Sequence, residues 1–132
     1  MSIQVKRDQS QAMRHIVHVR NHLISVDGAV DEGGVDAGPN PHDLYDAALG
    51  ACKALTLVWY AKRKNIPVED IQVSIERDAS AERQGTYRLA ATIHLTGQLS
   101  DAQRQELLAV AEKCPVQKLV TSVTTEVTTA LA

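Results

Sequence analysis

Two cysteines are the residues of this sequence with the clearest capacity for chemistry. Cys52 lies in the stretch GPNPHDLYDAALGACKALTLVW, Cys114 follows much later in EKCPV, and the chain has no third cysteine. Such a pair can act as attacker and resolver: one thiolate attacks an electrophilic oxygen and becomes a sulfenic acid, and the second thiol then closes a disulfide. This chemistry requires the two Cα atoms to approach within about 7 Å.

Each cysteine also has an inert interpretation. Free cysteine is among the most buried residue types, so both residues can be small core side chains. Cys52 is expected in the middle of a helix among apolar neighbours, which favours the inert interpretation. Cys114 precedes Pro115 and is expected at the start of a helical segment, where the helix dipole favours a thiolate. The local sequence therefore makes Cys114 the more reactive of the two.

Composition and charge restrict the class of function. The chain has 132 residues and a net charge of -2 with no basic run, which argues against a nucleic-acid partner. No apolar stretch approaches membrane-spanning length, so we expect no membrane partner, and the N-terminus MSIQVKRDQS lacks the apolar region of a signal peptide. We therefore expect a cytoplasmic protein, in a reducing compartment where two cysteines do not form a structural disulfide.

Strands and helices follow one another in an order typical of an α+β fold. A capping box of Ser100 and Gln103 predicts a helix to about Lys113, and Pro115 opens a short helical segment. Alternating apolar or β-branched residues predict strands at 3–6, 14–19, 23–28, 69–78, 86–97 and 122–131. We expect antiparallel sheets in one domain, residues 1–132.

A long helix is predicted from Pro41 to about Lys64. Asn40 is a good N-cap, Asp43 can reach back as its capping partner, and Pro67 prevents continuation. At about 100° per residue, four charged residues of this helix share a narrow arc, and apolar residues occupy much of the rest: the four are Asp43, Asp46, Lys53 and Lys64. One sheet face cannot cover so broad an apolar surface, so we expect a second copy of the chain, a homodimer, to cover the other side.

Three histidines, His15, His18 and His22, lie close together in RHIVHVRNH. On a helix they would share a face and could hold a metal ion. The β-branched residues between them favour a strand, where His15 and His18 point to opposite faces. The glycines of the loop fit no phosphate-binding spacing. We therefore expect neither a metal site nor a cofactor.

Several features in order resemble the OsmC/Ohr family, the osmotically inducible and organic hydroperoxide resistance proteins. They are GPNP at the start of a helix, GAC in the middle of it, and CP about fifty residues after the helix ends. The resemblance implies an intertwined homodimer with antiparallel sheets packed around a long central cysteine-bearing helix. It also implies a thiol peroxidase with Cys52 as the attacking and Cys114 as the resolving cysteine, re-reduced by an external dithiol.

In such proteins an arginine near the start of an early strand stabilises the thiolate and orients the peroxide. Arg14 fits this role best in this sequence, with Arg20 as the second choice. The catalytic residues implied are thus Cys52, Cys114 and Arg14. The candidate binding residues are Tyr45, Leu55 and Trp59, because apolar neighbours would bind the alkyl chain of an organic hydroperoxide.

The sequence departs from the hydroperoxide resistance branch at one position. There a glutamate follows Asn-Pro and pairs with the arginine, whereas this chain has His42, followed by Asp43. The chain more closely resembles the OsmC-like branch. The alternative function is a non-catalytic dimer that binds a small ligand beside two inert cysteines.

Overall fold

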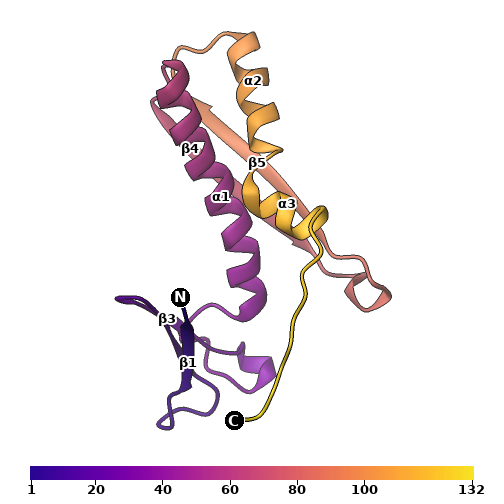
Figure 1. The fold of residues 1–132 in the computed structure, drawn as a ribbon. Coiled ribbons are helices and arrows are strands. Elements are labelled where there is room, and N and C mark those ends of the chain that lie inside the picture. The colour runs from indigo at the N-terminus through magenta and orange to yellow at the C-terminus, as the bar shows by residue number, and fades with distance from the viewer. The chain divides into compact units, whose positions relative to one another are not determined.

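The structure, a computed structural model, describes all residues from Met1 to Ala132. The chain forms two compact units, residues 1–45 and 46–132 (Figure 1). Each unit contains one antiparallel sheet, and three α-helices lie along the chain. The α+β class with antiparallel sheets is thereby confirmed, while the one-domain organisation stays a prediction.

The first unit is built on a three-stranded sheet in the order β1-β2-β3. β1 is Ile3–Arg7, β2 is His15–Val19 and β3 is His22–Val26, close to the predicted positions. A two-residue turn joins β2 to β3, and Arg20 adopts a left-handed backbone there with φ of 53°. Such turns match the twist of the strands they connect.

A buried carboxylate, Asp27, organises the loop after β3. Its oxygens accept hydrogen bonds from the backbone N–H groups of Gly28, Val35 and Ala37, at 2.8 to 3.1 Å. The bond from Ala37 contributes most to a pKa of Asp27 below the ordinary value. The loop includes a short 3-10 helix, η1 (Val30–Glu32), and leads to α1.

The long helix α1 runs from Pro41 to Lys64, as predicted. The Asp43 N–H donates to Asn40 Oδ1 at 2.9 Å, and the Asn40 N–H donates to Asp43 Oδ2 at 3.0 Å. This reciprocal pair satisfies two N–H groups that the first turn of a helix leaves free. None of the three α-helices combines the length and apolar character that crossing a bilayer requires.

The second unit packs α1 and α2 against a hairpin. β4 (Asp70–Asp78) and β5 (Arg88–Thr96) pair antiparallel, with η2 (Glu82–Gln84) in their connection. α2 is Asp101–Ala111, with the predicted Ser100–Gln103 capping box, and lies beside α1 in Figure 1. The core side chains come from both helices and from the segment between α1 and β4: Leu57, Ala61, Ile66, Leu107 and Ala111.

The C-terminal segment corrects one prediction. α3 (Pro115–Thr121) is the expected short helix, but residues 124–132 form no strand. Their alternating β-branched residues have high strand propensity. A strand also needs a hydrogen-bonded neighbour, and the tail pairs with neither sheet of this chain.

Candidate functional site

Cys52 lies near the middle of α1, on the side that meets α3. Its side chain is half-buried, and its Sγ accepts a hydrogen bond from the Val116 N–H at 3.4 Å. Thr56 Oγ1, one turn along α1, lies 4.0 Å from the same sulfur. An N–H donor interacts more favourably with an anionic sulfur than with a neutral thiol. The surroundings of Cys52 are therefore more polar than its neighbours in the sequence indicate.

Cys114 occupies the N-cap position of α3, as the following Pro115 predicts. Its side chain is completely buried, at 0% exposure, and its N–H donates to Ala111 O at 3.4 Å. Both cysteines are free thiols. Because Val116 is only two residues beyond Cys114, its hydrogen bond to Cys52 brings the two cysteines to one corner of the second unit.

A buried cation, Lys53, lies at the same corner. Its side chain is 5% exposed, and its Nζ donates to Ala111 O at 2.9 Å and to Gln117 Oε1. Ala111 is the last residue of α2, and Gln117 lies in the first turn of α3. Lys53 therefore connects α1 to both helices that flank Cys114.

A second buried charge on α1, Asp46, faces the hairpin. Its Oδ2 accepts from Arg77 Nε at 2.6 Å, and its Oδ1 accepts from the Tyr87 hydroxyl at 2.6 Å. Arg77 belongs to β4, and Tyr87 immediately precedes β5. Burial, together with the hydrogen bond to Asp46, raises the pKa of Tyr87 above its ordinary value. The three side chains fasten α1 to the sheet.

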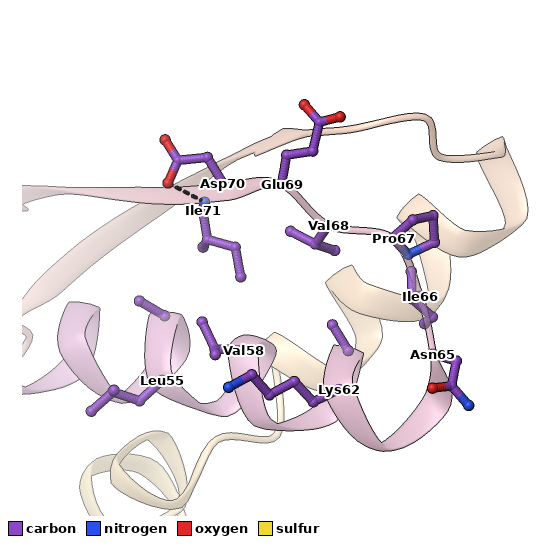
Figure 2. Close-up of a pocket in the computed structure, with 12 residues that line it drawn as sticks. Leu55, Val58, Lys62, Asn65, Ile66, Pro67, Val68, Glu69, Asp70 and Ile71 are labelled. Carbon is purple, nitrogen blue, oxygen red and sulfur yellow. Dashed lines mark hydrogen bonds between the residues drawn. The ribbon is translucent and has the colours of Figure 1, made fainter.

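A cavity of about 630 Å³ lies between the C-terminal half of α1 and residues 65–71 (Figure 2). Leu55, Val58 and Val68 contribute to its apolar wall. Its volume is in the range of small-molecule sites. The cysteines do not line it, so the cavity is separate from the thiol corner, the part of the second unit that holds Cys52, Cys114 and Val116.

The three candidate binding residues all lie on α1, and their side chains are exposed. Leu55 is 71% exposed and lines the cavity, whereas Trp59, at 58% exposure, does not line it. The Arg63 guanidinium lies 4.9 Å from the centre of the Trp59 ring. Tyr45 is in the second turn of the helix. Binding of an alkyl chain by these side chains stays a prediction.

Arg14 belongs to the first unit and directly precedes β2. Its Nη1 lies 3.3 Å from Asp8 Oδ2, and its Nη2 donates to Ser25 Oγ at 2.9 Å. Arg20, the second choice, is exposed in the turn before β3, where its Nη1 lies 3.6 Å from the Met1 sulfur. The cysteines belong to the second unit, so an arginine beside Cys52 stays a prediction.

The three histidines lie on strands and not on a helix, as predicted. His15 and His18 are on β2, and His22 begins β3 opposite Val19. No group of three or more His, Cys, Asp or Glu side chains is arranged to hold a metal ion. The carboxylate of Asp43 caps α1, and His42 is the second residue of that helix.

Lys53 and Asp46 are the residues of the site region to which sequence reasoning gave no role. Both lie on the narrow charged arc of α1, a pattern that usually marks a solvated face. In the structure Asp46 and Lys53 are buried together with Leu49, Gly50 and Leu57, whereas Asp43 and Lys64 at the two ends of the arc are exposed. The signal that could have identified them is the flanking apolar sequence, which leaves each charge isolated within a helical stretch rich in alanine and leucine.

Comparison with known families identifies one match over most of the chain. The family model described as OsmC-like protein matches residues 33–129. No protein with a curated description matches the sequence significantly.

Solved structures share the fold at low sequence identity. A candidate osmotic stress induced and detoxification response protein from Psychrobacter arcticus aligns with a TM-score of 0.75 and 20% identity, over 92% of this chain and 89% of that one. The organic hydroperoxide resistance protein OsmC of Legionella pneumophila aligns with a TM-score of 0.67 and 21% identity, over 92% and 88%. The organic hydroperoxide resistance protein OhrB of Bacillus subtilis aligns with a TM-score of 0.60 and 23% identity, over 92% and 90%.

Proposed function

We propose that this chain, which belongs to the OsmC-like protein family, is a thiol-dependent peroxidase that reduces organic hydroperoxides through Cys52 and Cys114. Two structural relatives, from Legionella pneumophila and Bacillus subtilis, are named organic hydroperoxide resistance proteins. Those names support the substrate class, and the thiol corner supports the mechanism.

In the proposed cycle the Cys52 thiolate attacks the outer oxygen of the hydroperoxide ROOH. The O–O bond breaks, an S–O bond forms, and Cys52 becomes a sulfenic acid. The alkoxide takes up a proton and leaves as the alcohol ROH. The Cys114 thiol then attacks the Cys52 sulfur, so that a disulfide forms and water leaves with the transferred oxygen. An external dithiol reduces this disulfide and is itself oxidised.

One observation carries the proposal: the Val116 N–H donates to Cys52 Sγ, two residues from Cys114. The donor favours negative charge on the sulfur that must attack. Val116 follows Cys114 by two residues, and this proximity of Cys114 to α1 supports its proposed role as the resolving cysteine.

We propose that Arg14 supplies the positive charge of the site. An opposite charge within about 4–6 Å of a thiolate stabilises it strongly. Arg14 has two partners in its own unit, the Asp8 carboxylate and the Ser25 hydroxyl. They hold its guanidinium in a defined orientation. The substitution Arg14→Gln is expected to slow hydroperoxide consumption while leaving the disulfide-forming step intact.

We also propose that the partner of this chain is a second copy of itself. Leu55, Val58 and Trp59 are exposed on α1 at 71%, 43% and 58%. Contiguous exposed apolar side chains mark interaction surfaces. A second copy over this face would enclose the alkyl group of a substrate against Leu55 and Trp59. Sedimentation equilibrium should give the dimer mass; a monomer at all concentrations would contradict the proposal.

The test of the activity is consumption of cumene hydroperoxide by the purified protein with dithiothreitol as reductant. Cys52→Ser should lower the rate to that of the protein-free reaction, because the attacking sulfur is gone. Cys114→Ser should still gain one oxygen atom in intact mass but form no intramolecular disulfide. Wild-type turnover in Cys52→Ser would refute the proposal.

The second candidate is a non-catalytic protein that binds a small ligand. The observations in its favour are the complete burial of Cys114 and the cavity of about 630 Å³ away from the cysteines. Under this candidate, Cys52 reacts slowly with iodoacetamide at neutral pH, as an ordinary thiol does, and hydroperoxide leaves the mass unchanged. Rapid alkylation of Cys52 and a disulfide after one equivalent of hydroperoxide would exclude it.

A further inference from the structure

Lys53 is a charged group in the interior of the second unit, and the proposed reaction does not use it. Moving an ammonium group out of water costs several kcal/mol unless hydrogen bonds and opposite charge compensate. The two acceptors of Lys53, Ala111 O and Gln117 Oε1, carry no net charge. The carbonyl of Ala111 does lie at the negative end of the α2 dipole, so the compensation for this buried charge comes from the α2–α3 connection.

These contacts surround the segment that carries Cys114. Ala111 O accepts both from Lys53 Nζ at 2.9 Å and from the Cys114 N–H at 3.4 Å. Gln117, on the other side of Cys114, is held by the same ammonium group. Lys53 itself follows Cys52 in α1. One side chain therefore ties the helix of the first cysteine to the chain before and after the second.

We propose that Lys53 is the positioning residue of the Cys52–Cys114 couple. Its ammonium group holds residues 111–117 against α1, so that the Cys114 thiol is presented to Cys52. This inference rests on the proposed function in one respect: it takes the two cysteines to be redox partners.

The physical basis is the steep geometric requirement of disulfide formation. The Cα atoms must lie within about 7 Å, and the Cβ–S–S–Cβ dihedral must be near ±90°. An α2–α3 connection released from α1 samples this geometry less often, and a displacement of about 1 Å can lower a rate by about 100-fold. Loss of Lys53 should therefore slow the closing of the disulfide.

The test uses diamide, which takes two electrons and two protons from the two thiols and leaves them as a disulfide. This step needs no peroxide, so it is independent of the proposed activity. Disulfide formation in the full-length protein is followed by intact mass after quenching. Lys53→Met removes both hydrogen bonds and keeps the length of the side chain. Lys64→Met is the matched control, since Lys64 is an exposed lysine on the same helix.

We expect Lys53→Met to slow disulfide formation by about 10-fold or more, and Lys64→Met to stay within about twofold of wild type. Gln117→Met, which removes one of the two acceptors, should give an intermediate rate. It also keeps the inference testable if Lys53→Met does not fold. Wild-type rates in both Lys53→Met and Gln117→Met, or equal slowing in Lys64→Met, would overturn the inference.

A second measurement separates positioning from a general loss of structure. After one equivalent of cumene hydroperoxide, dimedone traps any sulfenic acid that has not yet been resolved. Lys53→Met should shift the product from disulfide towards the trapped sulfenic acid, whereas a lower stability alone leaves this partition unchanged. Wild type that forms the disulfide with diamide, but neither a disulfide nor a trapped sulfenic acid with hydroperoxide, would refute the peroxidase and leave the role of Lys53 standing. Wild type that forms no disulfide with diamide would overturn the role of Lys53.

Discussion

The two buried charges of α1, Asp46 and Lys53, lie two helical turns apart on one face and are held in opposite ways. Asp46 is 8% exposed and has a charged partner, Arg77, at 2.6 Å. Lys53 is buried to a similar extent, but its partners are a backbone carbonyl and a side-chain amide. The first arrangement fastens a helix to a sheet, and the second holds the segment next to a cysteine.

The difference shows that burial alone does not tell what a charged residue is for. A carboxylate between a guanidinium and a hydroxyl is satisfied on both oxygens and serves stability. An ammonium with neutral acceptors contributes little net stability, because its desolvation cost offsets most of what its hydrogen bonds contribute. We therefore expect substitutions at the two positions to have different effects. A change at Asp46 lowers the free energy of unfolding, and a change at Lys53 slows disulfide formation between the thiols.

The largest effect on stability is expected for Asp46→Ala. It removes the acceptor of two hydrogen bonds and should lower the free energy of unfolding by about 2 kcal/mol. This loss is smaller than for a fully buried ion pair, because Arg77 stays partly hydrated. Urea denaturation of Asp46→Ala, Arg77→Met and the double variant measures the coupling between the two residues. Diamide-driven disulfide formation in Asp46→Ala should remain within about twofold of wild type; a 10-fold slower rate would contradict the separation of the two roles.

A smaller loss is expected for Tyr87→Phe. This change removes one hydrogen bond to Asp46 and should lower the free energy of unfolding by about 1 kcal/mol. The matched control is Tyr60→Phe, since the Tyr60 hydroxyl bonds Glu106 at 2.5 Å on the exposed surface and should contribute less. Equal losses in the two variants would mean that the buried hydrogen bond to Asp46 stabilises the fold no more than the exposed one to Glu106.

A still smaller change in stability is expected for Lys53→Met. Replacing a buried charge by an apolar side chain of similar length is often neutral, so the free energy of unfolding should change by less than about 1 kcal/mol. Thermal unfolding of the reduced protein measures this. A loss of unfolding free energy as large as that of Asp46→Ala would mean that Lys53, like Asp46, mainly stabilises the fold.

The last effect is confined to alkaline pH. Burial and the bond to Asp46 raise the pKa of Tyr87 above the ordinary 10.0, so the fold favours the neutral phenol. This contribution is complete below the ordinary value and is lost as the pH rises through the raised pKa. The difference in unfolding free energy between wild type and Tyr87→Phe should therefore shrink above about pH 10. A difference that grows as the pH rises would contradict a raised pKa of Tyr87 in the folded protein.

Local signals predicted most elements of the fold. Asn40 with Asp43, and Ser100 with Gln103, mark the starts of α1 and α2 because a cap is decided by residues three positions apart. Alternation marks the strands for the same local reason. The tail was predicted wrongly as a strand, because its β-branched residues report propensity and not the presence of a partner.

The sequence by itself determined the boundaries of the helices, the N-cap position of Cys114 and the resemblance of the cysteine motifs to one family. These depend on neighbours along the chain. Only the tertiary structure decided that Asp46 and Lys53 are buried and that Val116 donates to Cys52. It alone identified Lys53 as the residue that connects both sides of Cys114 to α1. Those contacts join residues about sixty positions apart, and their formation depends on how α2 and α3 pack against α1, which no local pattern encodes.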